Sequence, residues 1–382
     1  MVKDKEFYKR FFSMCVVIVL QNIITLSVNL ADNVMLGNYN ETALSGATAV
    51  NQLQFVYQQL LLGIGDALVI LGSQYWGRKQ TGKIKTVASI AIACGITVML
   101  IYVVLTTVMP REIVAIFTKD EAIIDQGVAY LITIKYTYIF FCFTSILLSL
   151  LRSVETVKIA FYLSISSLII NCSINYILIY GHFGFPEMGI EGAAIGTLIS
   201  RIIELSLLVL YIIFKEKKLQ INLKELLYFD KKMFFTYIKI AVPIIIGAAF
   251  WGINTAAQTA ILGNMSSSAI AANSVASNLF LLVKTSAVGT ASTTAVLIGK
   301  MIGQGKTEEL KTYSRTFQVM FVIFGAVCSV ILYFLIDPVL SIYNLSEESK
   351  NLAHSFLLVL VFIMFFMSYQ MPTNTGLIRG AG

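Results

Sequence analysis

Residues 30–38 read LADNVMLGN and residues 256–264 read AAQTAILGN, so Leu36-Gly37-Asn38 recurs 226 positions later as Leu262-Gly263-Asn264. The same offset carries Gly63 onto Gly289 and Lys85 onto Lys311. The apolar blocks and the charged loops between them also begin and end in step. Such agreement over a long stretch indicates that one structural unit is used twice in this chain.

The composition of the chain points to a membrane. Hydrophobic residues make up 57% of the 382 residues, charged residues make up 13%, and the mean hydropathy is +0.80. A water-soluble globule cannot cover so much apolar surface. The blocks are uniformly apolar and do not alternate as barrel strands do, which predicts helices. We therefore expect an all-α polytopic membrane protein with about ten transmembrane helices, at roughly residues 11–36, 50–75, 86–108, 125–150, 159–181, 191–214, 233–263, 272–299, 315–337 and 352–378.

The basic residues orient these helices. Most of the 28 Lys and Arg residues lie in the N-terminal tail, in the loops after even-numbered helices, or at the C-terminal end, and only Arg111, Lys119 and Lys350 lie in the opposite loops. The positive-inside rule then predicts a cytoplasmic N-terminus in the plasma (inner) membrane. Basic loops beside anionic headgroups account for the net charge of +7, so no nucleic-acid partner is expected. The chain has no GxxxxGK[ST] sequence, so no ATP binding is expected either.

The two copies put their basic loops on the same side, so each copy holds an even number of helices and the repeats are parallel. We predict an N-terminal lobe of six helices at residues 1–214, a cytoplasmic linker at 215–232, and a partial C-terminal lobe of helices seven to ten at 233–382. The alignment of the copies sets Gly382 opposite Glu155. We therefore expect the second repeat to be incomplete and the chain to be C-terminally truncated by two helices.

Three acidic residues lie within predicted helices, namely Asp32, Asp66 and Glu204. An ionisable group at bilayer depth is costly, so each is a candidate for function. The second repeat has no acid between Lys231 and Thr307, so a carboxylate that binds a coupling ion must come from the first. Asp32 has the neutral Gln258 at its repeat position, which favours a special role. The alternative is that Asp32 is hydrated near the extracellular end and caps a turn.

Two further pairs have the spacing of neighbours on one helical face. Asn171 and Asn175 are four residues apart, and we expect their amides to face the bundle, either as ligands of an ion or as an interhelical hydrogen bond. Arg201 and Glu204 are three residues apart, the spacing of an ion pair. That pair keeps both charges neutralised in the membrane, or it helps to relay protons.

The sequence Gly63-Ile64-Gly65-Asp66 suggests a rival function. Intramembrane aspartyl proteases use a G-x-G-D sequence with a second aspartate, because two carboxylates must share a proton to activate water. Asp32 would be the second acid. Packing glycines explain the motif better, since Gly63 recurs at Gly289 without a following acid. Asp66 remains a candidate for a second cavity acid.

The early part of the second helix is unusually polar. Asn51, Gln54 and Gln58 fall on one face, close to Tyr57, and this lining suits flat amphipathic organic molecules. Packing against a neighbouring helix is the alternative. Lys284 occupies the repeat position of Gln58, and we expect it either to snorkel or to line the substrate cavity, where its charge would substitute for a coupling ion.

Four motifs resemble one known family. Residues 170–197, INCSINYILIYGHFGFPEMGIEGAAIGT, resemble the fifth-to-sixth helix signature of multidrug and toxic compound extrusion (MATE) transporters. Residues 30–37 (LADNVMLG), 73–77 (SQYWG) and 377–382 (LIRGAG) resemble the ends of the first, second and tenth helices of that family. The resemblance covers the whole chain. It implies two six-helix lobes around a central cavity, and export of organic compounds, often cations, in exchange for protons or sodium ions.

The resemblance also assigns roles to residues. It implies that Asp32 is the first-helix aspartate of the family and that Asn171 and Asn175 lie near it in the cavity of the first lobe. Some members carry an aspartate where this chain has Asn175, so their ion site does not transfer directly. A proton-coupled role would require Asp32 to load and release a proton within the physiological range.

Repeat, topology and motifs together favour a secondary antiporter and not an enzyme. We expect it to export organic drugs or metabolites in exchange for H⁺ or Na⁺, with coupling at Asp32, Asn171, Asn175 and Asp66. No cofactor is expected besides the coupling ion, and no metal besides Na⁺ at Asp32. The alternative is a flippase for lipid-linked sugars or other amphipaths, which would show a strongly cationic cavity, and the remote alternative is the protease.

Overall fold

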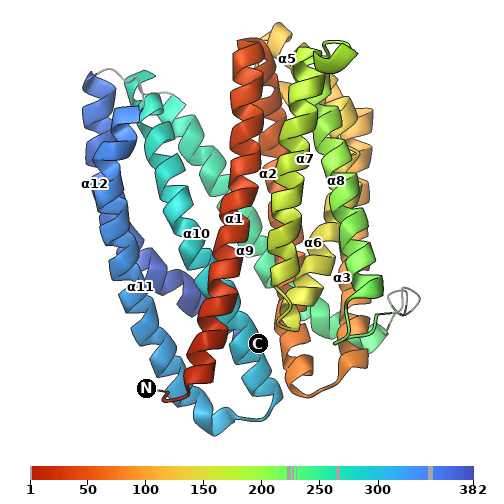
Figure 1. Ribbon diagram of the computed structural model, residues 1–382, viewed down its shortest axis with the longest axis vertical. Coiled ribbons are helices and arrows are strands. Elements are labelled where there is room, and N and C mark those ends of the chain that lie inside the picture. The colour runs from red at the N-terminus through yellow and green to blue at the C-terminus, as the bar shows by residue number, and fades with distance from the viewer. Residues whose placement is uncertain (1, 222–224, 226–227, 229, 264–266, 343–346) are drawn as a thin grey trace. The chain divides into compact units, whose positions relative to one another are not determined.

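The computed structural model describes residues 2–221, 225, 228, 230–263, 267–342 and 347–382, without the side chains of 253, 255–263, 267–271, 274, 307 and 342. Every regular element in this part of the chain is a helix (Figure 1), which confirms the all-α prediction. The elements are α1 (Lys5–Tyr39), α2 (Glu41–Gly77), α3 (Thr81–Val108), α4 (Pro110–Ala115), α5 (Glu121–Ile134), α6 (Thr137–Ser153), α7 (Lys158–Tyr180), η1 (His182–Gly184), α8 (Gly189–Phe214), α9 (Lys231–Gly263), α10 (Ser267–Gly303), α11 (Thr307–Ile342), α12 (Glu347–Met371), η3 (Pro372–Ile378) and α13 (Arg379–Ala381).

The described helices match the predicted number of membrane spans. Nine of them are long and apolar enough to cross a bilayer, and the count rises to ten if the bent pair of α5 and α6 forms one span. The nine include α1, α2, α3, α7 and α8 in the first copy of the repeat. The remaining spans lie in α9 to α12, where the last continues through η3 into α13. The prediction of about ten transmembrane helices is confirmed.

The repeat is visible in where the helices begin. Corresponding helices of the two copies start at positions separated by the offset read from the sequence, namely Lys5 and Lys231, Glu41 and Ser267, Thr81 and Thr307, and Glu121 and Glu347. Two parallel repeats of one helical unit therefore account for the element order, as predicted.

The fourth predicted helix is not continuous in the first copy. We predicted one helix over residues 125–150, but α5 and α6 are bent by 55° at a short break between Ile134 and Thr137. Around the break, backbone hydrogen bonds join residues that are three positions apart, as in a 3₁₀ turn. The Tyr138 N–H, for example, donates to the Lys135 carbonyl at 3.2 Å. The Thr137 hydroxyl also donates to the Ile134 carbonyl at 2.6 Å, which satisfies an acceptor that the interrupted helix leaves open.

The chain forms two compact units. Unit 1 contains residues 1–23, 73–79 and 250–382, and unit 2 contains residues 24–72 and 80–249. The helix α1 therefore contributes to both, with the change between Ile23 and Ile24. Each unit has its own buried apolar cluster, built around α10, α11 and α12 in unit 1 and around α1, α2, α5, α7 and α8 in unit 2. The lobe boundaries at 214 and 233 stay a prediction.

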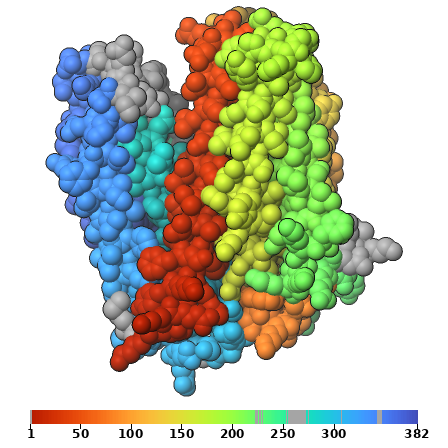
Figure 2. Space-filling model, viewed as in Figure 1, coloured from red at the N-terminus to blue at the C-terminus, as the bar shows by residue number. Residues whose placement is uncertain are grey.

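Within unit 2, α7 and α8 lie side by side (Figure 1), which decides the geometry of the site. Gly192 permits this close approach, because a Cβ there would lie 2.7 Å from the backbone of Leu178. Gly181 ends α7 in the left-handed region, with a φ of 69°, and so begins the turn toward α8. Figure 2 shows that the side chains of the two helices close over the line between them. Their outer faces carry exposed apolar residues such as Ile169 and Leu210, as expected for helices that face lipid.

The predicted linker is attached to unit 2 in its described part. The Glu216 carboxylate accepts hydrogen bonds from the backbone of the following turn, and Lys218 Nζ donates to the Val154 carbonyl at 2.6 Å. Further along, Lys85 Nζ of α3 lies 2.5 Å from a carboxylate oxygen of Glu225. These contacts hold the linker against the ends of α3 and α6.

Candidate functional site

The candidate site lies inside unit 2, at the level of Asp32 on α1. Nδ2 of Asn175 donates a hydrogen bond to Oδ1 of Asp32 at 2.6 Å. The same nitrogen lies 3.4 Å from Oδ1 of Asn171, one turn earlier on α7. Both asparagines are fully buried, whereas Asp32 is partly exposed. The structure therefore brings together the three residues that the sequence predicted for ion coupling, and it joins α1 to α7 through them.

Two hydroxyl groups extend this cluster onto other helices. Nδ2 of Asn171 donates to the Thr197 hydroxyl of α8 at 3.2 Å. The buried Tyr130 of α5 interacts with the Thr197 side chain and with the charge of Asp32. Neither residue could be predicted from the sequence, because a lone Thr or Tyr in an apolar helix has no spacing pattern. The only available signal was that the α7–α8 motif ends at Thr197.

Gly196 shapes the cluster from the side of α8. A Cβ at this position would lie 2.0 Å from Oδ1 of Asn175, so only glycine leaves room for the amide. The same Oδ1 is buried and has no hydrogen-bond partner among the residues that the structure describes. An unpartnered buried oxygen beside a carboxylate is suited to a cation, because hard cations bind oxygen ligands.

Arg201 and Glu204 form an ion pair one to two turns further along α8. Their side chains meet at 2.7 Å and are 13% and 6% exposed. The Arg201 guanidinium also lies over the Phe141 ring at 5.2 Å and interacts electrostatically with Asp32. The pair therefore belongs to the surroundings of Asp32.

A small pocket lies beside the ion pair of Arg201 and Glu204. It is lined by residues of α1, α7 and α8, namely Thr25, Val28, Ser164, Ser167, Arg201 and Glu204. On each of these helices the lining lies one or two turns from the Asp32 cluster, since Val28 precedes Asp32 by four residues and Ser167 precedes Asn171 by four. Polar side chains thus follow the same three helices from Asp32 to Glu204.

Asp66 does not join this cluster. Its charge interacts with Arg152 of α6 and with Tyr237 of α9, within unit 2. Gly65 packs tightly at this level, because a Cβ there would lie 2.4 Å from Oγ of Ser149. Among the described residues, the groups that interact most strongly with Asp32 are Arg201, Asn175 and Asn171, and Asp66 is not among them. This is not the arrangement of an aspartyl protease, in which two carboxylates share a proton, so the geometry does not support that alternative.

The polar face of α2 is only partly as predicted. Asn51, Gln54 and Gln58 are partly exposed, as a lining requires. Tyr57, in contrast, is fully buried, and its hydroxyl donates to the carbonyl of Tyr138 at 2.7 Å. The Tyr57 ring therefore faces the interior of unit 2, beside the break between α5 and α6, and is enclosed by protein.

Lys284 lies in unit 1, on α10. It is 9% exposed, and its Nζ lies 3.8 Å from the centroid of the Trp251 ring of α9. The side chain of Gln258, at the repeat position of Asp32, lies outside the described residues.

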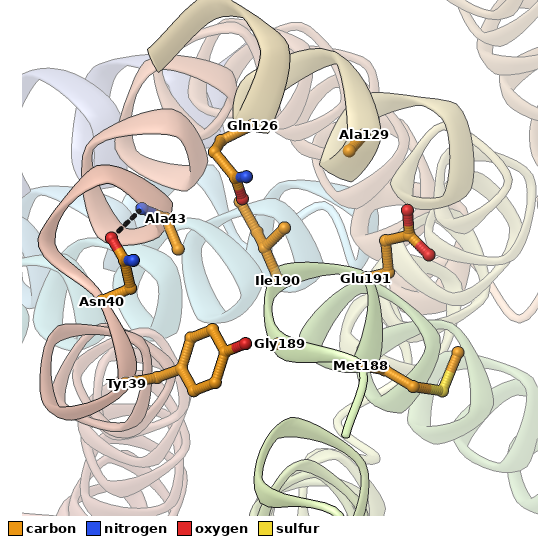
Figure 3. Close-up of a pocket in the computed structure, with 9 residues that line it drawn as sticks. All are labelled: Tyr39, Asn40, Ala43, Gln126, Ala129, Met188, Gly189, Ile190 and Glu191. Carbon is orange, nitrogen blue, oxygen red and sulfur yellow. Dashed lines mark hydrogen bonds between the residues drawn. The ribbon is translucent and has the colours of Figure 1, made fainter. Parts of the chain in front are cut away.

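A larger pocket of about 210 Å³ lies where α1 ends and α2 and α8 begin. Figure 3 shows its lining, including the Tyr39 ring, the Gln126 amide and the Glu191 carboxylate. None of the residues predicted for coupling or substrate binding lines it. At the turn beside this pocket, Oδ1 of Asn40 accepts a hydrogen bond from the backbone N–H of Ala43 at 3.4 Å.

Long apolar helices around a buried cluster of polar and ionisable groups are typical of a multi-pass membrane transporter. The family model MatE matches residues 18–177 and 243–382. The chain belongs to the MATE family of multidrug efflux transporters, which are not enzymes.

Individual relatives agree with this assignment. The chain is 28% identical to the probable multidrug resistance protein NorM of Streptococcus pneumoniae R6, over 98% of this chain and 82% of that protein. It is 24% identical to the probable multidrug resistance protein YoeA of Bacillus subtilis 168, over 94% and 78% of the two chains. The fold is similar to an outward-facing multidrug resistance MATE transporter, with a TM-score of 0.87, 16% identity, and coverage of 98% and 82%. A MATE protein in its straight conformation has a TM-score of 0.86 at 16% identity, with the same coverage.

Proposed function

We propose that this protein is a secondary antiporter that exports small organic molecules, often cations, in exchange for H⁺ or Na⁺ bound at Asp32. The observation that carries the proposal is the 2.6 Å hydrogen bond from the buried amide of Asn175 to Asp32. A carboxylate held inside a helix bundle is costly unless its charge is balanced. The neighbouring cation, Arg201, is already paired with Glu204, so a proton or a sodium ion is the natural counter-charge for Asp32.

Ion binding at Asp32 would change its link to α7. An ionised Asp32 accepts the amide hydrogen of Asn175, and a bound proton weakens this charge-assisted bond. A sodium ion would instead use the carboxylate together with amide and hydroxyl oxygens of Asn171, Asn175 and Thr197. Exchange follows if ion and drug compete for one site or favour different conformations. Asp66 is a candidate for a second coupling acid, at a separate place in unit 2.

The ion pair of Arg201 and Glu204 is a candidate relay. Hydroxyl groups of Ser164 and Ser167 line a pocket together with this pair. Proton relays inside membranes use polar side chains that are joined by hydrogen bonds or by a bridging water. In this proposal Glu204, beside Arg201, passes protons between the pocket and Asp32.

The substrate would meet the polar face of α2. Asn51, Gln54 and Gln58 offer neutral hydrogen-bond partners that are partly exposed, and such groups accept varied organic molecules. We place the protein in the plasma membrane with a cytoplasmic N-terminus, which the distribution of basic loops supports.

Efflux of ethidium from proteoliposomes tests this function under an imposed proton or sodium gradient. We expect one gradient to drive efflux and Asp32→Asn to reduce the driven rate about tenfold or more, because the coupling carboxylate is lost. Asp337→Asn is the matched control, since Asp337 is 86% exposed on α11. Driven efflux that survives Asp32→Asn would move coupling to Asp66 or Glu204. Absence of efflux under either gradient would favour the lipid flippase.

A further inference from the structure

Lys284 is a buried cation near the middle of α10. At a rise of about 1.5 Å per residue, it lies about 26 Å from the Ser267 end and about 29 Å from the Gly303 end of the helix. The residue is 9% exposed, and its Nζ lies 3.8 Å from the ring centroid of Trp251. Both residues belong to unit 1.

Unit 1 offers Lys284 no carboxylate. Its seven acidic residues lie in the N-terminal segment, at the start of α11, near the end of α11 and at the start of α12, namely Asp4, Glu6, Glu308, Glu309, Asp337, Glu347 and Glu348. Among the described residues, Lys284 forms no ion pair. The residues of unit 1 whose side chains are not described contain no Asp or Glu in the sequence, so they add none. The ammonium group therefore has no anionic partner within its unit.

A cation–π contact orients the ammonium group but leaves its charge in place. A buried charge is costly until an opposite charge reaches it. The repeat shows that the charge is not needed for packing, because the corresponding position in the first copy is the neutral Gln58. Asp32 in the first copy and Lys284 in the second each have a neutral residue at the repeat position of the other copy.

Trp251 adds an aromatic surface to this charge. The residue is 42% exposed although Nζ of Lys284 lies 3.8 Å from its ring centroid, so part of this aromatic side chain is accessible to a ligand. The hydroxyl of the neighbouring Thr285 donates to the Leu282 carbonyl at 2.7 Å. The Thr285 hydroxyl is thus already bonded to its own helix, whereas Nζ of Lys284 lies against the Trp251 ring.

We propose that Lys284 and Trp251 form a subsite for substrates that carry a carboxylate on or near an aromatic ring. The carboxylate pairs with Nζ of Lys284, and the aromatic part stacks on Trp251. This inference rests on the proposed export function and narrows its substrate class. It assigns unit 1 a specificity for anionic groups, whereas Asp32 in unit 2 provides the site for cations.

Two probes that differ in one group test the subsite. Rhodamine B carries a free carboxylate, and its ethyl ester has the same ring system without that charge. Their binding to the purified full chain in detergent is measured by fluorescence anisotropy. We expect Lys284→Met to raise the Kd of rhodamine B about tenfold or more and to change the Kd of the ester less than about twofold. Lys284→Arg, which keeps the charge, should keep rhodamine B binding within about threefold.

The controls separate a subsite from a structural role. Lys350→Met removes an exposed lysine from the same unit and should change neither Kd. Trp251→Leu should weaken both probes, because both have the ring. Equal weakening of both probes by Lys284→Met would show a structural lysine and overturn the proposal, as would no change in either.

The anionic partner could also be a lipid headgroup. The same measurements in nanodiscs of phosphatidylcholine, with and without phosphatidylglycerol, distinguish this source. Two results together would show that a lipid occupies the site. Phosphatidylglycerol would compete with rhodamine B only in the protein that has Lys284, and Lys284→Met would leave rhodamine B binding in phosphatidylcholine unchanged. The proposal would then fail. Binding is measured without a gradient, so failure of ion-driven efflux would overturn the proposed function and leave this test intact.

Discussion

Replacement of Gly196 by alanine should disconnect Asn175 from Asp32. An added Cβ would lie 2.0 Å from Oδ1 of Asn175, where ordinary contact begins near 3.4 Å. The amide must therefore move by about 1.4 Å, and a movement of this size away from Asp32 would lengthen their 2.6 Å bond to about 4 Å, which is outside hydrogen-bond range. The substitution thus acts on the coupling carboxylate without changing any polar residue.

The cost of Gly196→Ala follows from three contributions. Overpacking of a tight interior costs about 1–3 kcal/mol. Loss of an interhelical, charge-assisted hydrogen bond costs about 1–2 kcal/mol. Alanine has a higher helix propensity than glycine, which stabilises the variant by about 1 kcal/mol. The net loss is about 1–4 kcal/mol. A sodium ion that loses the Asn175 oxygen as a ligand should bind about tenfold more weakly, whereas a proton should bind more tightly, because the lost bond favoured ionised Asp32.

Ion-driven ethidium efflux and thermal unfolding in detergent measure the two effects. Gly82→Ala is the matched control, because a Cβ at Gly82 meets nothing within 4 Å. We expect Gly196→Ala to slow driven efflux about tenfold and Gly82→Ala to behave as the unmodified protein. If sodium is the coupling ion, a high sodium concentration should restore the rate, because binding is weakened. If the proton is the coupling ion, a high proton concentration should not restore it, because release is slowed. Unchanged efflux at limiting ion concentration in a folded Gly196→Ala protein would refute the link between the amide and coupling.

Two further predictions concern buried polar contacts. Tyr57→Phe removes the donor to the Tyr138 carbonyl and should destabilise the protein by about 1–2 kcal/mol, seen as a lower Tm, while the substrate profile stays the same; an altered substrate profile would place Tyr57 in the cavity instead. Arg201→Met leaves Glu204 buried and unpaired at 6% exposure and should cost about 3–5 kcal/mol, whereas adding Glu204→Gln should restore much of the Tm. Equal losses in the single and the double variant would contradict a buried ion pair.

The helix register could be predicted from the sequence because two independent signals coincide. The apolar blocks mark the spans, and the repeat relates Lys5 to Lys231 and Glu121 to Glu347, where corresponding helices do begin. The bend after Ile134 was not predictable, since it depends on hydroxyl groups that take over backbone bonds, such as that of Thr137. Hydropathy reports only that a segment is apolar, and a bent pair is as apolar as a straight helix.

Some residues of the candidate site could also be predicted from the sequence, and others could not. Asp32, Asn171 and Asn175 could be found because a charge in an apolar block and a four-residue spacing are visible in one dimension. Thr197 reaches them only because α8 packs on α7, and the spacing of residues in the sequence does not reveal that contact. Tyr57 was predicted to line a cavity because its neighbours in sequence are polar, but its own ring lies on the buried side of α2.

The central claim is that Asp32 exchanges an ion for an organic substrate, and substrate-driven ion flux tests it most directly. Ethidium is added to one side of proteoliposomes without any imposed gradient, and proton and sodium movements are recorded with internal indicators. The account predicts that ethidium drives one of these ions in the opposite direction, and that Asp32→Asn abolishes the flux while ethidium still binds. Equal ion flux in the Asp32→Asn protein would contradict the account.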